Sequence, residues 1–123
     1  MYLFFDTETT GIPRKYKAPA SNLKNWPRLV QIAWLITSDT AEQISSAEYI
    51  IRRDGYTIPP TAAKVHGITT QKALQVGVDV GTALDAISHE IDAATTLVAH
   101  NMSFDEKILG SELLRAGRPN TVE

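Results

Sequence analysis

The chain has 123 residues, with 12 Lys and Arg against 14 Asp and Glu, a formal net charge of −2 and no cysteine. This length suits one domain with a single core, which we expect to span residues 1–123. The composition excludes a disulfide framework, a thiolate metal site and a nucleic-acid partner held by a broad basic surface. No apolar run is long enough to cross a membrane, so we expect a cytoplasmic protein without a membrane partner.

The first predicted strand carries two acidic residues. Residues 2–8 are apolar apart from Asp6, Thr7 and Glu8. Because side chains alternate between the faces of a strand, Asp6 and Glu8 share one face, with Cα atoms about 6.5 Å apart. Two carboxylates there repel each other and lose hydration unless a hard divalent cation such as Mg²⁺ compensates them. The alternative is a strand end at which both acids simply reach solvent.

A long polar connection follows over residues 12–28. It contains three prolines and the cations Arg14, Lys15, Lys17 and Lys24. Loops of this length are often functional. These cations lie beside the acid-bearing strand end, where they could meet a phosphodiester, or they belong to a solvated loop. The sequence leaves both interpretations open.

Two further strands are predicted next. Residues 29–36 are nearly continuously apolar, which is typical of a strand buried on both faces. Residues 42–52 are expected to form a hairpin with it through a turn near Asp39, and to end at Asp54 and Gly55.

Two short helices are predicted after the third strand. Pro59 and Pro60 are expected to open the first, and Gly67 to end it. Thr69 can cap the second, which runs to about residue 75.

The last third of the chain predicts a strand between two longer helices. Residues 79–94 have amphipathic helical spacing, and residues 96–99 form a short apolar strand. A final helix is expected to start at Ser103, with Ser103 and Glu106 as a capping box. Strands with short connections followed by a helical crossover predict an α/β fold with a mixed sheet.

A third acid, Asp105, is expected at the second position of this predicted final helix. An acid there favours the helix dipole by about 0.3–1 kcal/mol and needs no further role. Ligands of open α/β sheets, however, collect outside the carboxyl ends of strands, where Asp6, Glu8 and Asp105 all lie. If the first and fourth strands are parallel neighbours, the three carboxylates converge.

Three segments of this chain resemble the signatures of one enzyme family. Residues 5–11 (Phe-Asp-Thr-Glu-Thr-Thr-Gly) and residues 98–105 (Val-Ala-His-Asn-Met-Ser-Phe-Asp) resemble the first and second signatures of the DEDD-type 3′–5′ exonucleases. This is the family of the proofreading epsilon subunit of bacterial DNA polymerase III. Pro59 and residues 65–69 resemble the segment that the family places beside the 3′ end of its substrate. The resemblance implies a ribonuclease-H-like fold, with a five-stranded mixed sheet flanked by helices.

The resemblance also implies a chemistry and a site. The reaction is removal of nucleotides from 3′ ends by two divalent metals, Mg²⁺ or Mn²⁺. Asp6 would bridge both metals, Glu8 would hold one, and Asp105 would help to hold the other, directly or through water. The terminal nucleotide, expected to be single-stranded, would be cradled by a further set of residues: Thr9, Gly11, Ile12, His66, Asn101 and Phe104. Helical spacing allows Phe104 to pack in the core instead of stacking on a base.

The third signature of the family, which supplies the fourth acid, has no counterpart here. Glu112 and Glu123 lack its context, and the last strand and C-terminal helices are also missing from the pattern. We therefore expect a domain incomplete at its C-terminus, with weak or no activity alone. The alternative is a non-catalytic module that binds nucleic acid or a polymerase-like partner. Core bared by the missing helices could also drive self-association. Whether the substrate is DNA or RNA stays open.

Overall fold

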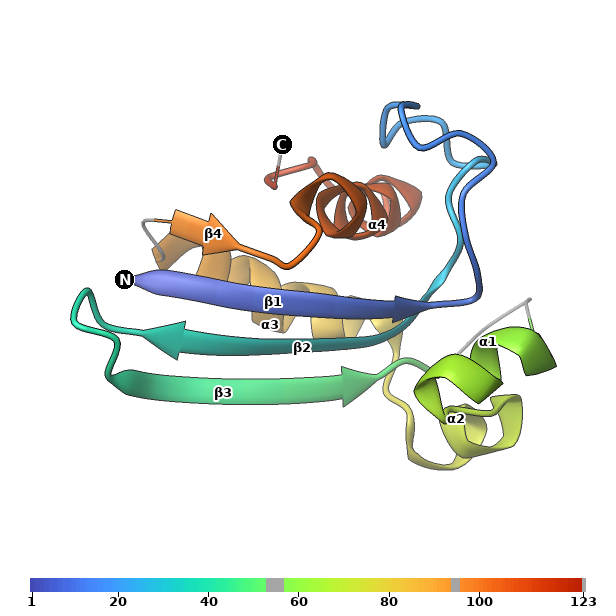
Figure 1. Ribbon diagram of the computed structural model, residues 1–123, viewed down its shortest axis with the longest axis horizontal. Coiled ribbons are helices and arrows are strands. Elements are labelled where there is room, and N and C mark those ends of the chain that lie inside the picture. The colour runs from blue at the N-terminus through green and yellow to red at the C-terminus, as the bar shows by residue number, and fades with distance from the viewer. Residues whose placement is uncertain (53–56, 94–95, 123) are drawn as a thin grey trace.

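The computed structural model describes residues 1–52, 57–93 and 96–122 (Figure 1). Its four strands form one mixed sheet in the order β3-β2-β1-β4. They are β1 (Tyr2–Thr9), β2 (Leu29–Thr37), β3 (Gln43–Ile50) and β4 (Thr96–Val98). β2 pairs antiparallel with β1 and with β3, whereas β4 runs parallel to β1. The predicted mixed sheet is confirmed, and the predicted end of the third strand at Asp54 and Gly55 lies outside the described residues.

The two faces of the sheet differ in burial because side chains alternate along each strand. On β1, Leu3 and Phe5 are buried, whereas Tyr2 and Phe4 are exposed. The prediction that residues 29–36 are buried on both faces was wrong. Alternate residues of β2 are buried, but those between them are only half-buried, because they share the open face with Phe4.

Four helices complete the fold of the residues that the structure describes. α3 (Val80–Ala93) and α4 (Met102–Arg115) contribute to the same hydrophobic core as the buried residues of β1 and β2. They therefore cover one face of the sheet. α1 (Pro60–His66) and α2 (Thr70–Val76) lie beyond the ends of β1 and β3 (Figure 1). Nine large apolar side chains of this core are fully buried: Leu3, Leu29, Ile32, Ile51, Leu84, Ile87, Ile108, Leu109 and Leu113.

Local signals set the limits of the short helices. α1 begins with Pro60 and ends at Gly67, whose φ of 76° lies in the left-handed region that glycine adopts without a steric penalty. Thr69 caps α2, because its hydroxyl accepts a hydrogen bond from the Lys72 N–H at 3.1 Å. Both helices were predicted from these residues. No helix in the described part of the chain is long and apolar enough to cross a membrane.

The start of α4 corrects one prediction. The helix begins at Met102 rather than Ser103, because the Asn101 carbonyl already accepts from the N–H groups of Phe104 and Asp105, each at 3.0 Å. The Ser103 hydroxyl donates to Asn101 Oδ1 at 3.1 Å, so Ser103 does not act as the N-cap of a capping box. Asp105 is consequently the fourth residue of the helix.

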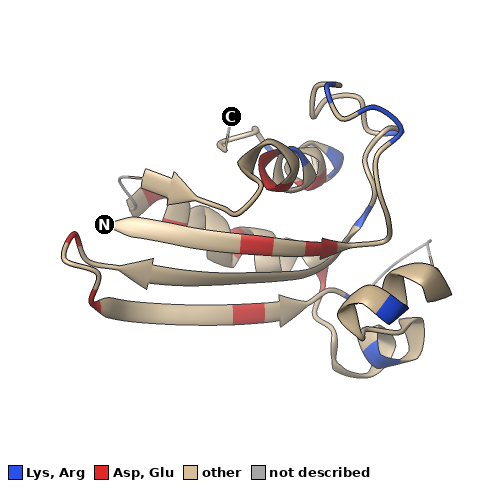
Figure 2. Cartoon of the chain, viewed as in Figure 1, with Lys and Arg blue, Asp and Glu red and all other residues tan. Residues whose placement is uncertain are grey.

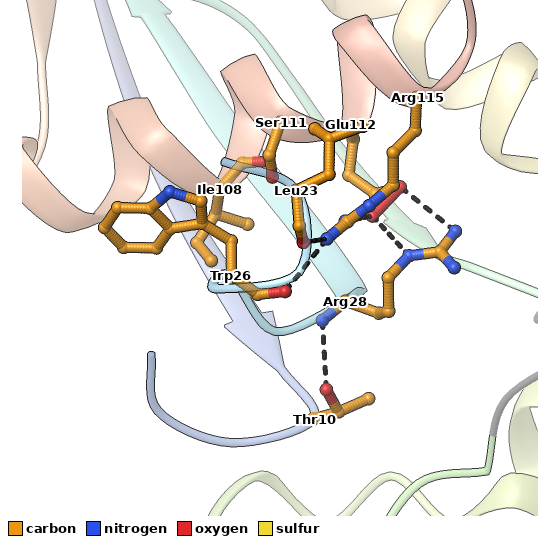
Figure 3. Close-up of polar contacts among 8 residues, drawn as sticks. All are labelled: Thr10, Leu23, Trp26, Arg28, Ile108, Ser111, Glu112 and Arg115. Atoms are coloured by element: carbon orange, nitrogen blue, oxygen red, sulfur yellow. Dashed lines mark hydrogen bonds and ion pairs between the residues drawn. The ribbon is translucent and has the colours of Figure 1, made fainter. Parts of the chain in front are cut away.

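An ion cluster around the buried carboxylate of Glu112 attaches the connection between β1 and β2 to α4 (Figure 3). Glu112 Oε1 accepts from Arg28 Nε at 2.7 Å and from Arg115 Nη1 at 2.5 Å. Arg115 Nη2 also donates to two carbonyls of the connection, Leu23 O at 2.6 Å and Trp26 O at 2.9 Å. Residues 12–28, although they form no helix or strand, are therefore held by specific contacts.

Candidate active site

Two predicted acids lie on the open face of the central strand. Asp6 stands opposite Ala33 and Glu8 opposite Gln31 in the register of β1 and β2. Asp6 is exposed, and Glu8 is half-buried. Leu3 and Phe5 determine which side chains of β1 face solvent. Both are buried against the helices, so the even-numbered side chains of the strand, Asp6 and Glu8 among them, point to the open face of the sheet.

The third acid, Asp105, lies at the edge of β1 beside Thr7. β4 pairs only with Tyr2–Phe4, so the β1 edge beyond Phe4 is open to the start of α4. Asp105 Oδ1 accepts from the Thr7 hydroxyl at 2.5 Å and from the Thr7 N–H at 3.3 Å. The side chain of Asp105 is only 3% exposed. β4 is thus the parallel neighbour of β1, but within the described residues the three carboxylates do not converge into a group that could hold one ion.

The carboxylates influence one another electrostatically. Burial raises the pKa of Glu8, the negative charges of Asp6 and Asp105 raise it further, and His66 opposes the shift. Burial likewise raises the pKa of Asp105, and the charge of Asp6 adds to it, while the hydrogen bonds from Thr7 act the other way. Burial first, and the neighbouring carboxylates second, therefore disfavour the charged forms of Glu8 and Asp105 at this end of β1.

The three acids do not lie close enough together to form a preformed metal-binding site. Within the described residues, no group of three or more His, Asp or Glu could hold one ion together. Asp6 and Glu8 project from the open face, whereas Thr7 and its partner Asp105 lie toward the helices. Their oxygen donors nevertheless suit a hard divalent cation, and their mutual repulsion favours one.

His66 connects α1 to the end of β1. Its Nδ1 accepts from the Ile68 N–H at 3.1 Å, which leaves Nε2 as the nitrogen that donates. Nε2 then donates to the Thr9 carbonyl, which lies 3.1 Å away. The Thr9 hydroxyl in turn contacts Gly11, donating to its carbonyl at 2.7 Å. The turn that follows the acid-bearing strand is therefore held from α1.

These elements enclose a cleft at the carboxyl end of β1. Six of the nine predicted site residues line it: Glu8, Thr9, Gly11, Ile12, His66 and Phe104. Ile12 and Val65 are 77% and 83% exposed, which leaves two large apolar side chains free at its walls. Such exposed apolar groups beside a polar cleft are typical of a ligand site.

The remaining predicted residues lie outside this cleft. Asp6 lines a second hollow over the open sheet face, together with Phe4, Val98 and His100. Asn101 is exposed at the start of α4. Phe104 both lines the cleft and packs edge-to-face on Trp26, with ring centroids 6.4 Å apart, so the two roles considered for it are compatible.

Sequence reasoning missed three residues of the site, namely Thr7, Thr61 and Ala62. Thr61 and Ala62 of α1 line the cleft beside His66, and no sequence signal marks them. Thr7 holds Asp105, and its position between Asp6 and Glu8, on the opposite face of the strand, was the available signal. Glu112, which lacked the context of a fourth acid, is paired with Arg28 and Arg115.

Comparison with known proteins identifies the family. The family model described as Exonuclease (RNase_T) matches residues 3–121. A comparison with curated proteins gave no match.

Solved structures of exonuclease I share the fold. The E. coli enzyme in complex with a dT13 oligonucleotide aligns with a TM-score of 0.80 and 23% identity, over 98% of this chain and 25% of that one. Its complex with a dA16 oligonucleotide gives a TM-score of 0.80 and 24% identity, over 97% and 24% of the two chains. The chain thus spans about a quarter of the length of exonuclease I. From the match over residues 3–121, the chain belongs to the RNase_T exonuclease family, in agreement with its DEDD-type motifs.

Proposed function

We propose that this chain removes nucleotides from the 3′ ends of single-stranded nucleic acid by metal-dependent hydrolysis. The observation that carries the proposal is the cleft at the carboxyl end of β1, which combines Glu8 with the turn at Thr9–Gly11, His66 and Phe104. Family membership supports a nuclease. The oligonucleotides bound to exonuclease I, a structural relative, suggest a single strand as the substrate.

Asp6 and Glu8 are the proposed metal ligands. Both are carboxylates on one strand face, and the raised pKa of Glu8, due first to burial and then to Asp6, indicates a site that a cation would stabilise. Asp105 is proposed to act indirectly, because Thr7 engages its carboxylate at the strand edge. A bound Mg²⁺ or Mn²⁺ would supply an activated water and stabilise charge on the phosphate oxygens.

The walls of the cleft are proposed to hold the terminal nucleotide. Ile12 and Phe104 offer apolar surface to a base or sugar, and stacking on a ring contributes about 1–3 kcal/mol without sequence preference. His66 is proposed to position the turn after β1 rather than to act as a base. Both of its ring nitrogens are engaged, one by the Ile68 N–H and the other by the Thr9 carbonyl.

A second candidate function is non-catalytic binding of nucleic acid. It is favoured by the spacing of the acids, since no group of three in the described residues could hold one ion. A polymerase partner stays a prediction from the family resemblance alone.

Degradation of a 5′-labelled single-stranded oligonucleotide in the presence of Mn²⁺ separates the two. Exonuclease action predicts a ladder that shortens from the 3′ end and disappears in Asp6→Asn. The matched control is Asp39→Asn, at the opposite end of the sheet, where Asp39 pairs with the N-terminus. A ladder that survives Asp6→Asn would remove Asp6 from the site. No ladder, with oligonucleotide binding retained, would support the non-catalytic module instead.

A further inference from the structure

The positive charge of this chain is concentrated in one segment. Residues 12–28 contain five of the 12 cations, namely Arg14, Lys15, Lys17, Lys24 and Arg28, and none of the 14 acids. The other residues therefore have seven cations against 14 acids. The net charge of −2 is the difference between a segment at +5 and a remainder at −7. The segment therefore has the opposite net charge to the rest of the chain.

Four of these cations are exposed, and three of them share one surface. Arg14, Lys15 and Lys24 line a common hollow, and Lys17 is exposed nearby in the sequence. Figure 2 shows the blue stretches of this segment beyond the end of β1. Tyr16, between Lys15 and Lys17, is 57% exposed. Cations interspersed with an accessible ring are the usual components of a single-strand binding surface.

The surface is held in place by its own polar contacts. The buried side chain of Asn25 accepts from the Lys15 N–H at 2.7 Å and donates to the Lys15 carbonyl at 2.9 Å, so it joins the two arms of the segment. Trp26 is buried, and its indole N–H donates to the Pro19 carbonyl at 2.9 Å. A surface that is already ordered has less conformational entropy to lose when it binds a ligand.

The same segment adjoins the cleft. Ile12 lines the cleft and Arg14 follows two residues later. Thr10 and Arg28 close the base of the segment with reciprocal hydrogen bonds of 3.0 Å, one of which is drawn in Figure 3. Trp26 contacts Phe104, another cleft residue. A strand whose terminal nucleotide occupied the cleft would have this surface beside it.

We propose that residues 12–28 bind the phosphodiester backbone of a single strand upstream of its 3′-terminal nucleotide. Arg14, Lys15, Lys17 and Lys24 contact phosphates, and Tyr16 stacks on a base. The proposal deepens the proposed function and relies on it for the direction of the strand. The chemistry recognised is the phosphodiester, which DNA and RNA share.

Binding of fluorescein-labelled dT16, measured by anisotropy between 50 and 200 mM salt without divalent metal, tests the proposal. Four phosphate contacts to a single strand predict an affinity that falls about 50-fold over this range. Lys15→Gln/Lys24→Gln leaves two contacts and should reduce the fall to about 7-fold. The matched control is Lys64→Gln/Lys72→Gln, because these exposed lysines of α1 and α2 lie outside the cleft lining. A parallel U16 probe tells RNA from DNA as the preferred strand.

Two further measurements complete the test. Tyr16→Ala should weaken dT16 binding by about fivefold or more, as expected for a stacked base. A dT4 probe, too short to extend from the cleft over the whole surface, should bind more weakly than dT16 and respond less to the lysine substitutions. An unchanged salt dependence in Lys15→Gln/Lys24→Gln, or an equal change in the control, would overturn the proposal. Because no metal is present, loss of nuclease activity alone would contradict the proposed function and leave this inference standing.

Discussion

Removing the carboxylate of Glu112 is expected to destabilise the fold more than any single surface change. Glu112 is 2% exposed, and Arg28 and Arg115 both donate to it. Through these arginines it connects α4, which carries Asp105, to the connection that follows β1 (Figure 3). The variant Glu112→Ala leaves two guanidinium groups without their shared counter-ion.

The magnitude follows from the burial of the partners. Breaking a buried ion pair by removing one member costs about 3–5 kcal/mol, because the remaining charge is left uncompensated. Arg28 and Arg115 are 33% and 17% exposed, and Arg115 keeps two backbone carbonyls. Part of the freed charge can therefore reach water, which favours the lower end, about 3 kcal/mol. For a domain of this size that corresponds to a fall in Tm of roughly 10 °C.

Urea denaturation and thermal melting of Glu112→Ala, with Glu106→Gln as the control on the same helix, check this value. Glu106 is only half-buried, so its substitution should change the free energy of unfolding by less than about 0.5 kcal/mol. Glu112→Gln keeps one oxygen acceptor and should fall between the two variants. If Glu112→Ala were no less stable than the control, the cluster would be screened by solvent and could not hold residues 12–28 in place.

Three other substitutions test separate parts of the structure. Burial, with a contribution from Asp6, raises the pKa of Asp105, so its contribution to stability is present at acid pH and is lost as the pH rises through the folded-state pKa. Asp105→Asn should therefore gain stability relative to the parent chain as the pH rises above the ordinary pKa of an Asp side chain; a constant difference in thermal melts would contradict this. Gly77→Ala places a Cβ 2.3 Å from the Ala73 carbonyl oxygen and should cost about 1–3 kcal/mol in urea denaturation, whereas a neutral effect would refute the close approach. Phe4→Lys, on the open sheet face, should weaken any self-association seen by sedimentation equilibrium, and association that is unchanged would exclude this face.

Much of the local structure could be predicted because its causes are local. The alternation around Asp6 and Glu8 fixes the phase of β1, and the Pro60 and Gly67 positions fix both ends of α1. The resemblance to the family motifs predicted further residues that line the cleft, such as Ile12, His66 and Phe104. Each of these signals is contained in fewer than about ten consecutive residues.

The parts that escaped prediction depend on partners far apart in the sequence. Asp105 binds Thr7 across 98 residues, and only the short pairing of β4 with the first half of β1 leaves that edge open. Glu112 meets Arg28 across 84 residues, so its burial has no signature of its own. The start of α4 is set by the Asn101 carbonyl, which accepts from the N–H groups of Phe104 and Asp105. The capping pattern at Ser103 had predicted a later start.

The central claim is that Asp6 and Glu8 together form a site for a divalent metal at the end of β1. Titration of Mn²⁺ into the chain, with free Mn²⁺ followed by electron paramagnetic resonance, tests it most directly. Our account predicts that the chain removes Mn²⁺ from solution, that Asp6→Asn and Glu8→Gln each weaken binding strongly, and that Asp39→Asn does not. Binding that is absent, or that is indifferent to both substitutions on β1, would contradict the assignment of these acids as metal ligands.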